Sequence, residues 1–384
     1  MSGALDGVVV IDASRVLGGP YCGQILADHG ARVIKVEPPT GDETRLWGPP
    51  FRGHQSSYFM GLNRNKDGIV LDLASDEGRE ALLQLLAGAD VFIENFKVGT
   101  LEKWGIGGDE LRQRLPGLVH CRVSGFGADG PYGGRPGYDA AIQALVGLMS
   151  VNGEAGGKPL RMGVPVVDIV TGLNAALGVL LALQERNRSG LGQFVEASLY
   201  DCGMSLLHPH LANVYLGGPV PEPAGNAHPN ITPYDTYPCA DGEIFLAVGN
   251  NGQFSKLCAQ LDSAETAEDP RFATNALRKE NRPALRAFLE ERLASHAAAE
   301  VAERLIQAGV PCAPVRNVEQ VINDPHTKAR GMIVEIGEEY RGTANPIKLS
   351  RSPASYRKAP PSLAEDAERI EQEFGLARTR PGAE

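Results

Sequence analysis

The chain has 384 residues, more than one hydrophobic core usually supports, so two domains are expected. Hydrophobic residues make up 42% and charged residues 22%, the composition of an ordinary globular protein and not of a disordered one. The net charge of −10 argues against general binding to nucleic acid or to an anionic membrane surface.

The first 125 or so residues alternate between strand and helix patterns. This alternation predicts a parallel sheet in a Rossmann-like, doubly wound α/β domain. The first turn lacks a Gly-x-Gly-x-x-Gly motif, which disfavours a nicotinamide or flavin cofactor. We expect strands at 7–14, 32–37, 68–73, 90–96 and 118–126, and helices at 18–31, 77–89 and 101–115.

Further along the chain, the patterns become mixed. A Pro/Gly-rich stretch after the helix pattern 200–216 places a domain boundary near residue 222. We therefore expect a large domain over 1–222, a smaller α+β domain over 223–325 and a C-terminal segment over 326–384. The remaining expected elements are a helix following Asp168, a strand at 192–199, a hairpin at 234–250, helices at 251–261, 281–294 and 297–309, a strand pair at 331–350 and a helix near 364–376.

The six cysteines are scattered without a Cys-x-x-Cys pair, which indicates neither a zinc site nor a disulfide framework and favours a reducing cytoplasm. The N-terminus lacks the pattern of a signal peptide. The longest apolar stretch, 169–183, is too short to span a bilayer comfortably and contains Asn174. We expect a cytoplasmic protein that does not bind a membrane.

Asp168 stands one residue before the apolar helix pattern that runs to Arg186. An Asp in this position is ordinarily an N-cap, which accepts hydrogen bonds from the unpaired amides of the first turn. The same amides and the helix dipole lower the pKa of such a carboxyl and leave it ionised, so that it could also be a nucleophile. The residues alone leave both interpretations open.

Other candidates are weaker. Asn95 and Phe96 end a predicted strand, at the edge of the sheet where ligands bind in open α/β folds. His228, in the loop "GNAHPN" at 225–230, has the chemistry of a general base, although a structural histidine is the simpler interpretation. The pair His208 and His210 is a poor metal site, and no Gly-x-Ser-x-Gly motif supports a serine hydrolase.

Several blocks of the sequence together resemble the class III CoA-transferase family, which includes formyl-CoA transferase, the carnitine CoA-transferases and α-methylacyl-CoA racemase. The resemblance spans nearly the whole chain. It is carried by "LDGVVVIDASRVLGGPYCGQILADHGARVIKVEPPTGDETR", "NRNKDGIVLDL", "ENFKVGTLEKWG", "RPGYDAAIQALVGLMSVNG", "VDIVTGLNAALGVLLALQERNRSGLGQFVEASLYD" and "GVPCAPVRNVEQVINDPHTKARGM".

The resemblance implies that Asp168 attacks an acyl-CoA thioester and passes through a mixed anhydride to an aspartyl-CoA thioester, from which a second carboxylic acid takes the CoA. CoA and acyl-CoA are then substrates, and neither a metal nor a permanently bound cofactor is needed. Succinyl-CoA is a possible donor and a small dicarboxylate a possible acceptor, whose second carboxylate could pair with Arg15, Arg45 or Arg161.

The family pattern also suggests further site residues. Related transferases carry a glycine-rich loop where this chain has Gly225, Asn226 and His228. The single glycine here puts a mobile lid in doubt, and His228 could instead shape the acceptor pocket. The implied CoA contacts are Val16, Arg45, Leu71, Asp72, Ala74, Asn95, Phe96 and Lys103, with Tyr138 beside the thioester.

Tyr138 favours transfer over racemisation. The racemases of the family use a His where this chain has Tyr138, and an ordinary phenol titrates near ~10, too high for proton transfer at neutral pH. Two alternatives stay open: a racemase, which would exchange an α-proton with water, and a non-catalytic acyl-CoA-binding protein. The resemblance further implies an interlocked homodimer, in which the small domain is inserted and the C-terminal segment returns to the large one.

Overall fold

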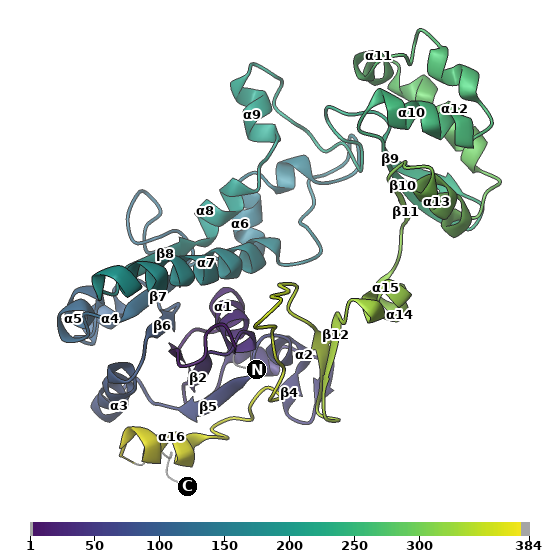
Figure 1. Cartoon of the computed structure of the whole chain (residues 1–384). Coiled ribbons are helices and arrows are strands. Elements are labelled where there is room, and N and C mark those ends of the chain that lie inside the picture. The colour runs from purple at the N-terminus through teal and green to yellow at the C-terminus, as the bar shows by residue number, and fades with distance from the viewer. Residues whose placement is uncertain (1–2, 378–384) are drawn as a thin grey trace. The chain divides into compact units, whose positions relative to one another are not determined.

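The structure, a computed structural model, describes residues 3–377, which form two compact units (Figure 1). The first unit comprises the described parts of Met1–Leu148, Met162–Leu216 and Pro325–Glu384, and the second comprises Met149–Arg161 and Gly217–Asp324. The second unit thus takes in residues 149–161, which the sequence analysis assigned to the large domain. Residues 378–384 of the expected C-terminal segment lie outside the described residues.

A six-stranded parallel sheet forms the centre of the first unit. Its order is β5-β2-β1-β6-β7-β8, so the chain reverses direction across the sheet between β1 and β6, where doubly wound folds bind ligands. The expected mixed α/β fold with a parallel central sheet is confirmed. The strands are β1 (Val9–Asp12), β2 (Arg32–Glu37), β5 (Lys66–Val70), β6 (Val91–Glu94), β7 (Val119–Ser124) and β8 (Phe194–Ser198).

Successive strand residues supply two separate cores because side chains alternate between the faces of a sheet. Val10 packs on one face with helices α1 (Gly18–Asp28), α6 (Asp139–Leu145), α7 (Val166–Ser189) and α8 (Leu199–Ser205). Ile11 packs on the other face with α3 (Asp76–Ala87), α4 (Thr100–Lys103), α5 (Gly108–Arg114) and α16 (Ala367–Phe374). Both faces are therefore covered, as a parallel sheet requires.

Two expected helices are broken in the structure. The helix expected at 101–115 divides into α4 and α5 because Gly105 adopts a φ of +70°, which an α-helix does not tolerate. The helix expected at 200–216 divides into α8 and α9 (His210–Tyr215) around Pro209, which has no amide N–H to continue the helix.

The second unit has the expected α+β composition. Its antiparallel sheet has the order β11-β10-β9, formed by β9 (Tyr234–Cys239), β10 (Gly242–Ala247) and β11 (Cys312–Pro314). Strands β9 and β10 are the expected hairpin. The core, which includes Leu257, Leu289 and Leu305, lies between this sheet and α10 (Asn251–Gln260), α11 (Asn275–Glu280), α12 (Arg282–Leu293) and α13 (Ala298–Gln307).

The C-terminal segment packs within the first unit. The side-chain amide of Asn65 donates to the carbonyl of Ser355 at 2.8 Å, and Lys358 forms an ion pair with Asp366 just before α16. The remaining described elements are β3 (Phe51–Arg52), β4 (Gln55–Ser56), α2 (Ser57–Met60), α14 (Val318–Asn323), α15 (Pro325–Ala329), β12 (Ile333–Ile336), β13 (Tyr340–Thr343) and the 3₁₀ turns Glu43–Leu46, Met149–Val151 and Ala264–Glu268.

All six cysteines lie within the described residues and are free thiols, and Cys239 alone among them is not buried. Burial raises the pKa of Cys258 to about 11 and that of Cys312 to about 12.

Candidate active site

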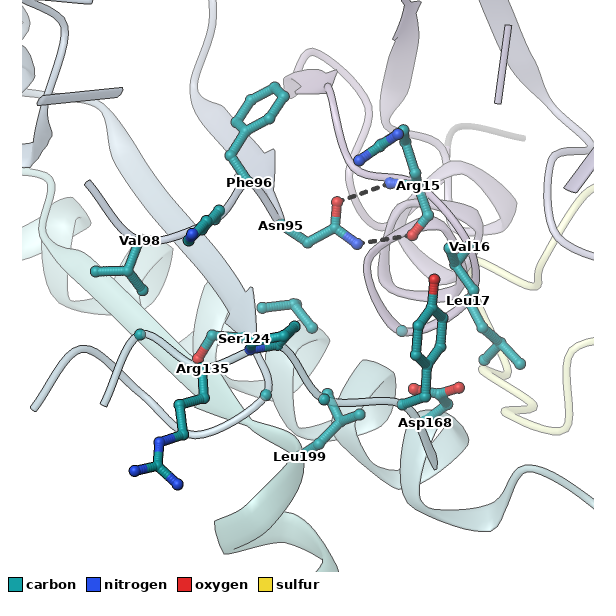
Figure 2. Close-up of a pocket in the computed structure, with 18 of the residues that line it drawn as sticks. Arg15, Val16, Leu17, Asn95, Phe96, Val98, Ser124, Arg135, Asp168 and Leu199 are labelled. Atoms are coloured by element: carbon teal, nitrogen blue, oxygen red, sulfur yellow. Dashed lines mark hydrogen bonds between the residues drawn. The ribbon is translucent and has the colours of Figure 1, made fainter. Parts of the chain in front are cut away.

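A pocket of about 300 Å³ lies at the carboxyl ends of β1, β6 and β7 (Figure 2). The segment after β1 contributes Arg15 and Val16, the end of β6 leads to Asn95, and Ser124 ends β7. Asp168 enters the pocket from the first turn of α7. The site is therefore at the switch between β1 and β6, where the fold predicts a ligand.

A close helix crossing brings Asp168 to this edge. A Cβ atom on Gly172 would lie 2.6 Å from the carbonyl oxygen of Gly18, so α7 can approach the start of α1 only because residue 172 has no side chain. A second close approach, between Gly125 and Gly137, holds the loop that carries Tyr138 against the end of β7. The glycine-rich segments thus bring backbone and side chains to the pocket.

Asp168 is not the N-cap of its helix, which corrects the sequence-based expectation. Helix α7 begins at Val166. Its N-cap residue is Pro165, whose side chain makes no capping hydrogen bond. The cap comes instead from Asp139, whose Oδ2 accepts hydrogen bonds from the backbone amides of Val167 at 2.8 Å and Asp168 at 3.2 Å. A carboxylate on α6 therefore caps α7, the role that the sequence suggested for Asp168.

The pKa of Asp168 is also opposite to the expectation. Burial, which leaves the residue 9% exposed, raises the pKa of the carboxyl, and the negative charge of Asp139 raises it further, to about 7. No hydrogen bond to the Asp168 carboxylate is found among the described residues. The amides of Val167 and Asp168, which would have lowered the pKa of Asp168, donate to Asp139 instead.

The backbone beside the pocket is held in a strained conformation. Val16 has a φ of +70°, which is rare for a β-branched residue. Asn95 fixes Arg15, the residue before Val16, with two hydrogen bonds. Its Oδ1 accepts from the amide of Arg15 at 2.9 Å, and its Nδ2 donates to the carbonyl of Arg15 at 2.7 Å (Figure 2). Asn95 therefore acts on the wall of the pocket through the backbone.

Two buried ion pairs lie near the segment that follows β1. Lys66 Nζ lies 2.8 Å from Asp12 Oδ2 at the end of β1, and Lys35 Nζ lies 3.0 Å from Asp42 Oδ2. Lys35 also donates to the carbonyl of Ser14. All four charged groups are almost completely buried. Lys35 and Lys66 therefore hold the backbone carbonyls of Ser14 and Pro20 in place through their hydrogen bonds.

A second pocket of about 240 Å³ adjoins the first, because Arg15 and Phe96 line both. It gathers the implied CoA contacts Leu71, Asp72 and Ala74. The first pocket gathers Val16, Asn95, Phe96, Tyr138 and Asp168.

Two implied CoA contacts do not line either pocket. Arg45 donates to Glu37 at 2.8 and 2.7 Å and stacks its guanidinium 3.7 Å from the centre of the Phe59 ring, so its charge is used inside the protein. Lys103 ends α4 on the exposed surface. These two assignments are therefore not supported by the geometry.

Gly225, Asn226 and His228 line a different cavity, of about 680 Å³, within the second unit. Arg282 and Arg286 line it as well, and Arg282 donates to the carbonyl of His228 at 2.9 Å. These three residues thus line one cavity, and none of them lines the pocket that contains Asp168.

The sequence analysis did not single out Asp139, whose carboxylate caps the helix that carries Asp168. Its position next to Tyr138, at the start of a helical pattern, was the available signal, but it reads as an ordinary acidic first turn. Within residues 3–377, no group of three or more His, Cys, Asp or Glu side chains is arranged to hold a metal ion.

The fold and the site define a doubly wound α/β enzyme whose pocket holds a buried carboxylate. A family model for CoA-transferase family III matches residues 5–367, so the chain belongs to that family and is a CoA-transferase, which confirms the resemblance.

Named relatives agree with this assignment. A succinate–glutarate CoA-transferase of Agrobacterium fabrum (strain C58) is 40% identical over 94% of this chain and 93% of its own length. The human succinyl-CoA:glutarate CoA-transferase is 34% identical over 96% of this chain and 85% of its own. The crystal structure of a CAIB/BAIF family protein from Brucella suis superposes with a TM-score of 0.88 at 42% identity, covering 97% of this chain and all of the other.

Proposed function

We propose that the enzyme transfers CoA from an acyl-CoA to a carboxylic acid with Asp168 as its nucleophile. The observation that carries this proposal is a buried carboxylate, without hydrogen bonds from the described residues, at the ligand-binding edge of the sheet. A desolvated, unbonded carboxylate is more nucleophilic than a solvated one because attack does not first have to remove a shell of donors.

The reaction proceeds in four balanced steps. An Asp168 oxygen attacks the thioester carbonyl, the C–S bond breaks, and CoA leaves as a thiolate from a mixed anhydride. The thiolate then attacks the Asp168 carbonyl carbon, which releases the donor acid and leaves an aspartyl-CoA thioester. The acceptor carboxylate attacks this thioester and again expels the thiolate. Attack of the thiolate on the acceptor carbonyl gives the new acyl-CoA and restores Asp168. No redox cofactor or metal takes part.

The large unit binds CoA in this proposal. The pocket formed by Leu71, Asp72, Ala74 and Phe96 continues into the pocket of Asp168, so a long ligand can occupy both. Tyr138 lines the pocket of Asp168, and a phenol in place of the imidazole of the racemases favours transfer.

The substrates are a succinyl-CoA donor and a small dicarboxylate acceptor. Two named relatives act on succinate or succinyl-CoA together with glutarate. In this chain, Arg15 and Arg135 line the pocket of Asp168, and a guanidinium is suited to a second carboxylate. The charge of Arg45 is paired with that of Glu37, so we favour Arg15 and Arg135 for this role.

A homodimer and a cytoplasmic location complete the proposal. Helix α7 has the length and composition of a membrane span, but its residues Ala175 and Val179 pack in the core of the first unit. Its opposite side exposes a row of leucines, and a second copy of the chain is the partner that the family resemblance implies. The row consists of Leu173, Leu177, Leu180 and Leu181. Six free cysteines are compatible with a reducing compartment.

Substitution of Asp168 tests the proposal. We expect Asp168→Ala and Asp168→Asn to abolish transfer from succinyl-CoA to glutarate, assayed by mass detection of acyl-CoA products, while CoA still binds. In the wild type, hydroxylamine added with acyl-CoA should label Asp168, as peptide mass spectrometry will show. Transfer by the Asp168→Ala variant at the wild-type rate would refute the assignment.

A further inference from the structure

The N-terminal end of α7 is capped by a different helix. Asp139, the first residue of α6, is buried and directs Oδ2 to the amides of Val167 and Asp168. Its other oxygen, Oδ1, accepts from Gln143 Nε2 at 2.5 Å. Gln143 Oε1 in turn accepts from the amide of Met162 at 2.9 Å. Asp139 is therefore held firmly by the segment that leads into α7.

This arrangement accounts for every amide in the first turn of α7. The amide of Val166 donates to the carbonyl of Val164, and that of Ile169 donates to the carbonyl of Pro165. The two amides between them donate to Asp139. An acidic residue at the third helical position commonly reaches back to the N-cap amide, but Pro165 has no N–H. Asp168 is thus left without a backbone donor in its own helix end.

We propose that Asp139 is the positioning residue of Asp168: it caps α7 in place of Asp168, which keeps the Asp168 carboxylate unbonded in the pocket. The inference rests on the proposed nucleophilic role of Asp168. It also explains why the Asp168 carboxylate, although it lies at the positive end of α7, is not stabilised by hydrogen bonds from the amides of that helix end.

The electrostatic surroundings of Asp168 support this role. Burial raises its pKa, and Asp139 is the one charged group that adds to the increase. Burial together with the charge of Asp168 raises the pKa of Tyr58, on α2, to about 12, so this phenol is neutral at physiological pH. The other charged groups that line the pocket are Arg15, Glu43, Lys97 and Arg135.

The variant Asp139→Asn tests the inference because it removes the charge but keeps an oxygen that can accept from the α7 amides. Gln143 can rotate its amide to present an oxygen to the new NH₂ group. With the charge gone, the pKa of Asp168 should fall below its wild-type value of about 7.

The measurement is the pH dependence of carbodiimide labelling of Asp168 in the full-length protein without substrate, read by peptide mass spectrometry. Labelling requires the protonated carboxyl, and exposed Asp201 serves as the internal reference for the reagent. We expect the midpoint of Asp168 to move to lower pH in Asp139→Asn, together with the acid limb of kcat/KM. The control Asp109→Asn, in the first turn of α5, should change neither.

The outcomes separate the two proposals. An unchanged labelling midpoint and an unchanged acid limb in Asp139→Asn would overturn the positioning role, even if Asp168→Asn is inactive. Full transfer activity in Asp168→Asn would remove the nucleophile itself, whatever the labelling shows. If Asp139→Asn does not fold, Asp139→Ser, a smaller neutral acceptor, carries the same expectation.

Discussion

For Asp168, the sequence suggested an N-cap with a lowered pKa, and the structure contradicts both features, whereas its role as nucleophile stays a proposal. The residue type and its place before an apolar helix are visible in the sequence, and so is the family pattern around it. The pKa is not visible because it depends first on burial and then on Asp139, which lies 29 positions earlier and meets α7 only in the folded chain. Local capping rules assume that a helix end uses its own residues, and here another helix supplies the cap.

The raised pKa of Asp168 predicts a pH-dependent cost in stability. The unfolded carboxyl loses its proton near pH 4, whereas the folded one keeps it to about pH 7. The folded state therefore binds more protons between these values, and its free energy of unfolding falls as the pH rises. We expect Asp168→Asn to be more stable than wild type at pH 8 by up to about 4 kcal/mol, and by much less at pH 4.

Urea unfolding of both proteins at the two pH values measures this difference. An Asp168→Asn protein that gains no stability between pH 4 and pH 8 relative to wild type would show that the native carboxyl titrates normally.

Asn95 was predicted to contact CoA, and the structure gives its side chain a structural task as well. Asn95→Ala removes both hydrogen bonds that hold the backbone of Arg15 next to the strained Val16. We expect kcat/KM to fall by roughly 10- to 100-fold, corresponding to about 1–3 kcal/mol for the lost hydrogen bonds. Steady-state kinetics will measure it, with Asn323→Ala on the exposed side of α14 as a control. A normal kcat/KM would mean that the clamp is dispensable.

At the scale of elements, the strands and most helices of the first unit follow from periodicity alone. Buried parallel strands are short apolar runs, and the helices between them have apolar faces that the sequence displays. The errors fall where single residues interrupt a pattern, at Gly105 and Pro209, and at the start of α7. The close crossing of α1 and α7 was not predictable because it depends on two glycines that are far apart in the sequence.

This crossing predicts the effect of adding one methyl group. In Gly172→Ala, the new Cβ would lie 2.6 Å from the Gly18 carbonyl oxygen, so α7 must move away from α1 and take Asp168 with it. We expect a loss of about 1–3 kcal/mol of stability and a lower kcat. Thermal unfolding and steady-state kinetics will show both. In Gly242→Ala, where no atom is within 4 Å, neither should change; equal effects in the two variants would exclude a crossing-specific cause.

At the scale of the whole molecule, the sequence predicted a large parallel-sheet domain, a smaller mixed one and a C-terminal segment. It did not predict that residues 149–161 join the second unit, because that stretch has no periodic pattern and is placed by contacts such as the bond from the Gly225 amide to the Gly153 carbonyl. The interlocked dimer came from family resemblance alone and stays a prediction.

The exposed side of α7 is where we expect a second chain to pack. Leu177 and Leu181 are 55% and 62% exposed, and a charge there would be buried in a dimer interface without a partner. The double variant Leu177→Asp/Leu181→Asp should therefore shift the protein towards the monomer in analytical ultracentrifugation. The control Ile306→Asp, on the exposed side of α13, should sediment as wild type does. An unchanged mass of the double variant would place the interface elsewhere.

The distribution of cysteines has a consequence for an enzyme that releases a thiol in every cycle. In the proposed mechanism CoA leaves and re-enters as a thiolate, and such a group readily attacks accessible disulfides or is itself captured by oxidised protein thiols. Within the described residues, no cysteine lines either of the two adjoining pockets, and five of the six are buried. In the two pockets, the released thiolate therefore has no cysteine sulfur with which it could form a mixed disulfide.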